Sequence, residues 1–114
     1  MTIVLQAQSL VEHMRHICER PRMYAPEFTL AHLFIFIQGY EAALEGAGLP
    51  SQHEPFREWI YRQQPEWRNS SMWWGGHVLE ECSSDLNRAL DRIITMIDAF
   101  LGSEGAAFAR SSKR

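Results

Sequence analysis

Histidine, cysteine and paired acidic side chains are the residues of this sequence whose types could do chemistry. His13 and His16 are three residues apart, as are His77 and Glu80, and Cys82 follows shortly after. Each pair therefore lies one helical turn apart on a single face. A zinc site needs a third and a fourth ligand, and the spacing brings none to either group. We predict no metal site and no cofactor.

Catalysis by a nucleophile or by an acid–base pair is not indicated either. Cys82 and His77 are five residues apart, about 140° around a helix, so they lie on different faces. Two pairs of carboxylates are present, Glu41 with Glu45 and Glu80 with Glu81. Neither pair lies in an apolar run that would raise a pKa for acid–base work, and the chain has no GxSxG or P-loop motif. We predict that the protein is not an enzyme.

Apolar residues recur at the helical period in five segments, and these segments position the side chains above. The pattern predicts helices over residues 5–19, 30–44, 55–64, 72–82 and 85–101. Thr29, a serine of residues 70–71 and Ser84 are the expected N-caps, and Gly46 and Gly48 the stop of the second helix. No segment alternates with period two. We predict an all-α, single-domain bundle of about five helices without a sheet over residues 1–101, followed by a flexible C-terminal tail, residues 102–114.

The second predicted helix is apolar around more than half of its girth, since Ile35 and Phe36 lie off its main apolar stripe. This pattern is typical of a central helix with neighbours on several sides. Gly39 weakens a helix interior, so we expect another helix to approach closely there. The second and last helices would form the spine of the bundle.

Charge and composition limit the classes of function. Of the 114 residues, 46% are hydrophobic and 22% charged, as in an ordinary globular protein. The net charge of −3 becomes −5 once the +2 of residues 102–114 is set aside, so we expect no nucleic-acid partner. The start of the chain does not resemble a signal peptide, and its longest apolar run is five residues, against the 20 or so that span a bilayer. With two cysteines that lack CxxC spacing, we expect a cytoplasmic protein with no membrane contact.

Four tryptophans are concentrated in a short stretch, Trp59, Trp67, Trp73 and Trp74. Trp73 and Trp74 are adjacent and cannot share one helix face, so one of them should lie at a rim or at the surface. We expect Trp59 and Trp73 in the core and Trp67 and Trp74 exposed, where tryptophan flanked by charge is typical of a binding hot spot. The alternative is that all four close one end of the bundle.

Two motifs resemble a family of small helical bacterial proteins. The first is Ile17-x-x-Arg20-Pro21-x-Met23-Tyr24, and the second is Gly39-Tyr40-x-x-Ala43-Leu44. The chain is similar here, over residues 11–48, to immunity proteins encoded beside polymorphic toxins, including Rhs-type and type VI secreted effectors. Weaker similarity runs through Trp59 and residues 73–81. A structural reading of the first motif is a helix stop with Met23 and Tyr24 packed under the second helix.

The resemblance implies an immunity protein that binds a cognate toxin domain and occludes its active site. The toxin would act in the cytosol, for example as an ADP-ribosyltransferase, a nuclease or another enzyme that attacks NAD or nucleotides. From the composition we expect the toxin-binding residues to be Glu41, Glu45, Trp67, Trp74, Glu80, Glu81 and Asp85. Two alternatives stay open: a regulatory or nucleic-acid adaptor, and a small enzyme with an unrecognised site. The sequence leaves the oligomeric state undefined.

Overall fold

A computed structural model of the chain describes residues 9–105, which contain five α-helices and no strand. The helices are α1 (Ser9–Glu19), α2 (Leu30–Gly46), α3 (His53–Gln63), α4 (Trp74–Glu81) and α5 (Leu86–Phe100). Two 3-10 turns, η2 (Pro21–Met23) and η3 (Pro65–Trp67), and a π-helical turn, η4 (Leu101–Gly105), complete the described part. The predicted all-α bundle is confirmed.

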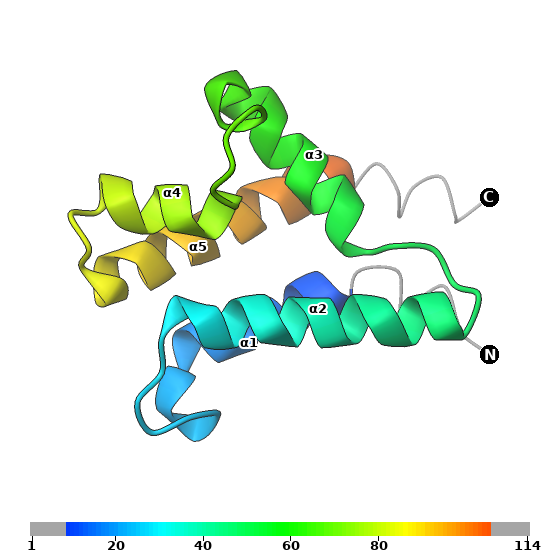
Figure 1. The fold of residues 1–114 in the computed structure, drawn as a ribbon, viewed down its shortest axis with the longest axis horizontal. Helices are drawn as coiled ribbons and strands as arrows, with labels where there is room; N and C mark the ends of the chain where they lie inside the picture. The colour runs from blue at the N-terminus through cyan, green and yellow to red at the C-terminus, as the bar shows by residue number, and fades with distance from the viewer. Residues whose placement is uncertain (1–8, 106–114) are drawn as a thin grey trace.

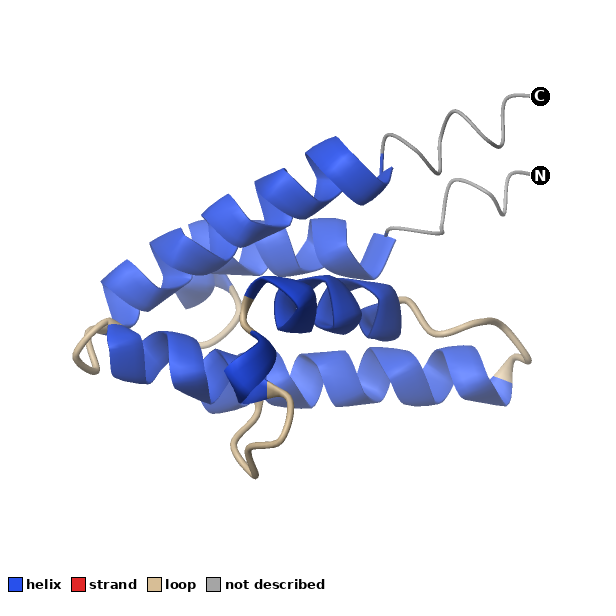
Figure 2. Cartoon of the chain, turned by 90° about the horizontal axis from the view of Figure 1, so that it is seen from above, coloured by secondary structure: helices blue, strands red, loops and turns tan. Residues whose placement is uncertain are grey.

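Helices α1 and α5 form the centre of the bundle. Helix α5 packs on α1, α3 and α4, whereas α2 packs on α1 and α4 and lies along one edge of the molecule (Figure 1). Seen from above, α2 and α5 lie on opposite sides of the bundle (Figure 2). The prediction that the second and last helices form the spine is therefore wrong, because α1 occupies the place beside α5 that we expected for α2.

The core is built from one apolar stripe on each helix. In α1 and α5 the spacing of apolar residues at three and four positions gives each helix a single inward face, as predicted. Full burial of one such side chain stabilises the fold by about 1.5–3 kcal/mol. The completely buried side chains include Leu10, Met14, Leu33, Ile37, Phe56, Ile60, Val78, Ile93 and Ile97. None of the helices in residues 9–105 is long and apolar enough to cross a membrane.

The boundaries of α1 and α2 follow local signals. Helix α1 ends at Glu19 as predicted, and the predicted residues 5–8 lie outside the described range. Thr29 is the N-cap of α2, and its backbone N–H donates to His32 Nδ1 at 3.0 Å. The helix stops where Gly48 takes a φ of +72°. Of the predicted tail, residues 102–105 lie in η4 and residues 106–114 fall outside the described part.

The predicted start of α4 and its serine cap are wrong. The helix begins at Trp74 with Trp73 as its N-cap, while Ser70 Oγ accepts the N–H of Met72 within the preceding loop. The Gly75–Gly76 pair permits this arrangement. A Cβ on Gly75 would overlap the indole of Trp73, and a Cβ on Gly76 would overlap the side chain of Met72. Both glycines therefore leave space for side chains that fold back over the first turn of the helix.

Ser84 does not cap α5, contrary to the prediction. Asp85 does so, because its Oδ1 accepts the N–H of Arg88 at 3.1 Å. Ser83 and Ser84 instead end α4 in the left-handed region, with φ of 57° and 62°. The N–H of Ser84 donates to the carbonyl of Leu79 at 2.9 Å, as in a Schellman stop. Side chains with a Cβ adopt this conformation at a cost that glycine avoids.

Replacing Ser83 by glycine should therefore stabilise the protein. We expect Ser83→Gly to raise the free energy of unfolding by about 0.5–1 kcal/mol, because the left-handed backbone is retained without the Cβ clash. Chemical denaturation measures the change. The control is Ser71→Gly, at an exposed loop serine without a positive φ, which should leave stability unchanged or lower it. A destabilised Ser83→Gly variant would contradict this account of the turn.

Candidate protein-binding surface

The two tryptophans expected at the surface are buried. Trp74 is 1% exposed and packs edge-on against Phe56, with ring centroids 5.4 Å apart. Its Nε1–H donates to His53 Nε2 at 3.0 Å, so the polar edge of the indole is satisfied inside the protein. Trp67 is 3% exposed, and its ring stacks on His77 at 4.9 Å. Their predicted exposure is wrong, since both rings find partners within the chain.

The two tryptophans expected in the core lie nearer the surface. Trp59 and Trp73 are half-buried and pack against the edge of the core. Trp73 touches Phe34 of α2, with ring centroids 5.0 Å apart. The prediction that one of the adjacent residues Trp73 and Trp74 lies outside the core is correct, but that residue is Trp73 and not Trp74. Residue type alone does not distinguish the two.

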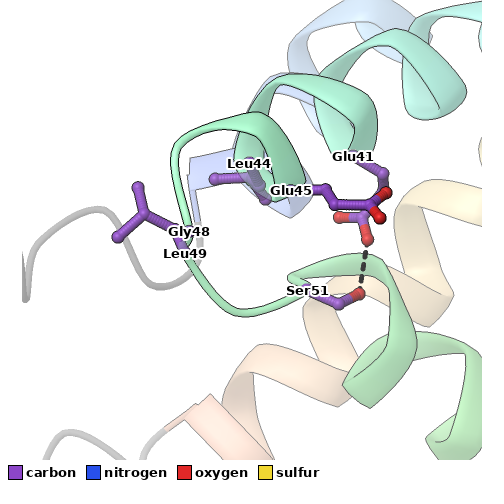
Figure 3. A pocket seen from close by; sticks show the side chains of 6 residues that line it. All are labelled: Glu41, Leu44, Glu45, Gly48, Leu49 and Ser51. Atoms are coloured by element: carbon purple, nitrogen blue, oxygen red, sulfur yellow. Dashed lines mark hydrogen bonds between the residues drawn. The ribbon is translucent and has the colours of Figure 1, made fainter.

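The carboxylate of Glu41 is part of the fold. It accepts the backbone N–H groups of Gln52 and His53 at 3.0 and 2.9 Å, together with the hydroxyl of Ser51 (Figure 3). A negative charge at this position satisfies unpaired N–H groups and interacts favourably with the positive end of the α3 dipole. It also explains why α3 begins at His53 and not at the predicted Pro55. Glu41 is therefore engaged within the chain.

The other predicted acidic contacts separate into two kinds. Glu81 pairs with Arg92 at 2.7 Å and Asp85 caps α5, although both side chains are exposed. Glu45 and Glu80 are exposed. Glu45 borders an open hollow of about 420 Å³ at the end of α2, which Figure 3 shows. Its other lining residues are Glu41, Leu44, Gly48, Leu49 and Ser51. The seven predicted residues do not form one surface.

Burial sets the protonation state of two titratable groups, His53 and Cys18. Burial, with a smaller effect of the Arg57 charge, lowers the pKa of His53 to about 4. The imidazole is therefore neutral and accepts the Trp74 N–H. Burial raises the pKa of the Cys18 thiol to about 12, which leaves it protonated and unreactive. Cys82 is also buried.

The histidines predicted as weak ligand candidates have local roles. His13 Nδ1 bonds the carbonyl of Ser9 at 2.7 Å, and His16 lies 3.8 Å from Glu19. His77 stacks on Trp67, and its Nε2 is buried without a hydrogen-bond partner in the described part of the chain. Across residues 9–105, no group of three His, Cys, Asp or Glu side chains could hold a metal ion.

The exposed apolar side chains were missed by the sequence analysis. Met23 and Tyr24 are 71% and 55% exposed, so the expectation that they pack under the second helix is wrong. Pro21 explains the difference: its carbonyl accepts the N–H of Tyr24 at 3.0 Å, which closes a rigid 3-10 turn. Phe28 provides the buried side chain at this end of α2 instead. We call residues 20–24 the η2 corner.

The outer face of α2 is also open to solvent. Ile35 is 66% exposed, and a Cβ added to Gly39 would have no described atom within 4 Å beyond its chain neighbours and the nearby backbone of its own helix. The prediction that another helix approaches Gly39, and that α2 is central, is therefore wrong. We define the outer face of α2 by its exposed residues Ala31, Ile35, Gln38, Gly39, Ala42 and Gly46.

Comparison of the chain with protein-family models, with curated proteins and with solved structures finds no match. The candidate functional surfaces therefore follow from geometry alone. They are the η2 corner and the outer face of α2, because exposed apolar groups gathered on a small domain are typical of protein-binding surfaces.

The buried imidazole of His53 should make stability depend on pH. Its pKa is about 4 in the folded protein against 6.5 for the free side chain, so the unfolded chain takes up the proton first. Stability is complete above about pH 6.5 and falls as the pH is lowered towards 4. Between about pH 7 and pH 5 this group should remove about 2 kcal/mol from the free energy of unfolding.

The variant His53→Gln tests this pH dependence. Glutamine can still accept the Trp74 N–H but does not titrate, so stability should vary less with pH in that window. His16→Gln, at an exposed histidine, is the control and should keep the slope of the unmodified protein. If His53→Gln and the unmodified protein lose stability equally, His53 is not the group responsible.

Proposed function

We propose that the chain is an immunity protein that binds and neutralises a cognate secreted toxin domain acting in the cytosol. The observation that carries the proposal is the η2 corner. The segment responsible for the family resemblance, Arg20-Pro21-Arg22-Met23-Tyr24, presents two large apolar side chains to solvent and holds them in a fixed turn. A purely structural motif would bury them.

The composition of the η2 corner suits recognition of a protein. Methionine, tyrosine and arginine are enriched in protein interfaces, and Arg20 and Arg22 are exposed beside Met23 and Tyr24. The turn is closed by hydrogen bonds from Met23 to the carbonyl of Arg20 and from Tyr24 to that of Pro21, both 3.0 Å. Binding through a turn that is already ordered loses little conformational entropy.

Occlusion is the mechanism that fits such a surface. A protein-binding role uses the exposed side chains of the η2 corner directly, whereas the Cys18 thiol is buried and protonated. The acidic body, with a net charge of −5 outside residues 102–114, does not suit a nucleic-acid adaptor. The toxin classes implied by the resemblance are an ADP-ribosyltransferase, a nuclease or another enzyme that attacks NAD or nucleotides, and the rigid η2 corner would block access to the active site of such an enzyme.

The test is binding to the toxin domain encoded beside the gene. Purified toxin domain should co-elute with the full chain and lose activity in its presence. Tyr24→Ala combined with Met23→Ala should weaken the complex about thirtyfold or more, since truncation at a hot spot typically costs at least 2 kcal/mol. Titration calorimetry measures the affinity.

Leu49→Ala is the matched control, because Leu49 is an exposed apolar residue beyond the opposite end of α2. It should bind as the unmodified chain does. Unchanged affinity of the Met23/Tyr24 variant would show that the interface lies elsewhere. A neighbouring toxin that the chain neither binds nor inhibits would refute the proposed function.

A further inference from the structure

We propose that the toxin presents carboxylates to Arg20 and Arg22, so that the η2 corner docks into an apolar depression with an acidic rim. The inference rests on the proposed function and names the chemistry of the partner's surface. It starts from an imbalance of charge. Residues 20–24 carry a charge of +2, whereas the whole chain outside residues 102–114 has a net charge of −5.

The two arginines of the η2 corner are exposed and unpaired within the described chain. Other arginines pair with a carboxylate at 2.7 or 2.8 Å, namely Arg15 with Asp98, Arg68 with Glu58 and Arg92 with Glu81. Neither Arg20 nor Arg22 has an ion pair or a side-chain hydrogen bond with any residue of 9–105. Of the acidic residues nearest in sequence, Glu19 pairs with Arg15, and Glu27 is exposed. Both guanidinium groups are therefore available to a partner.

The 3-10 turn holds these charges beside the exposed apolar side chains. Residues three positions apart lie on the same side of a 3-10 helix, which places Arg20 next to Met23. Met23 and Tyr24 are 71% and 55% exposed, whereas Pro21 is half-buried and η2 packs on α1. The side chains that project from the corner thus form an apolar centre with two positive charges at its edge.

Docking of the apolar centre would remove water from the two guanidinium groups. A charge that loses its water raises the free energy unless it is paired and hydrogen-bonded. The planar guanidinium donates two parallel N–H bonds to a carboxylate, which makes this the pair best suited to a dry contact. The surface that receives Met23 and Tyr24 therefore needs carboxylates at its rim. An uncharged apolar depression would leave both arginines unpaired.

Phosphate groups also fit the guanidinium, but the rest of the chain does not suit them. A nucleic acid brings a dense row of negative charges, which a body of net charge −5 repels, and the corner offers only Arg20 and Arg22 against it. A protein can place single carboxylates beside an apolar depression. Charge complementarity thus favours a protein partner. On an enzyme that attacks NAD or nucleotides, the corner would meet acidic side chains, not the basic groups that bind substrate phosphates.

Carbodiimide cross-linking of the complex tests for carboxylates at the rim. The reagent joins an amine and a carboxylate in contact as an amide, and Lys113 is the single lysine of the chain. An Arg22→Lys variant of the full chain, bound to the toxin domain encoded beside the gene, should form an amide between the introduced amine and an Asp or Glu of the toxin. Mass spectrometry identifies both residues. Arg88→Lys, at an exposed arginine of α5, is the control and should form no such amide.

Removal of one charge tests whether the pairing stabilises the complex. Arg22→Gln should dissociate about tenfold faster or more, because it leaves a desolvated carboxylate of the toxin unpaired. Its urea unfolding should match that of the unmodified chain, since Arg22 has no ion pair with a described residue. Arg88→Gln removes the same charge at another exposed arginine without such a pair, and should dissociate as the unmodified chain does. Biolayer interferometry measures the rates.

The outcomes separate this inference from the proposed function. If the Met23/Tyr24 variant weakens the complex and Arg22→Gln does not, the inference is overturned and the proposed function stands. Equal effects of Arg22→Gln and Arg88→Gln would also overturn it, because they would reflect overall charge, as would an intact complex in which Arg22→Lys forms no amide. Binding of duplex DNA or RNA that Arg22→Gln abolishes would assign the corner to phosphate groups instead. A toxin that the chain does not bind would refute both.

Discussion

A chain of hydrogen bonds that begins at the carboxylate of Glu41 links three of the five described helices. This carboxylate projects from α2 and accepts the first N–H groups of α3, at Gln52 and His53. His53 in turn accepts the indole N–H of Trp74 at the start of α4. Since buried polar groups are stable only when they are paired, the burial of Trp74 depends on His53 being in place and neutral. The position of α3 and α4 relative to α2 thus follows from one chain of hydrogen bonds.

The helices themselves could be predicted because each depends mainly on its own sequence. The apolar spacing in α1 and α5 fixes one inward face, and Gly48 marks the end of α2 through its positive φ. The starts of α3, α4 and α5 were predicted less accurately than the presence of these helices. Those of α3 and α5 depend on which oxygen reaches which N–H group, and for α3 that oxygen belongs to a residue of another helix, Glu41. Helix α4 begins where Gly75 and Gly76 leave space for the side chains of Trp73 and Met72.

The candidate site was predicted less well than the fold for a related reason. Tryptophan and glutamate are suitable both for a binding surface and for an internal hydrogen bond. Residue type alone therefore did not show whether Trp74 and Glu41 lie on a binding surface or make contacts within the fold. The apolar residues around α2 predict neighbours on several sides, but the other described elements cover only one side of this helix. The exposure of Met23 and Tyr24 depends on a turn closed by the carbonyl of Pro21. Pro21 is part of the motif, but the spacing of the motif does not show that this turn leaves both side chains exposed.

The claim that Glu41 organises the fold is tested most directly by comparing Glu41→Gln with Glu45→Gln in urea unfolding. Both residues lie on α2 one turn apart and line the same hollow. Glu41→Gln should lower the free energy of unfolding by about 2 kcal/mol, because it replaces a charged acceptor of two backbone N–H groups. Glu45→Gln should change it by less than about 0.5 kcal/mol. Equal stability of the two variants would contradict the account.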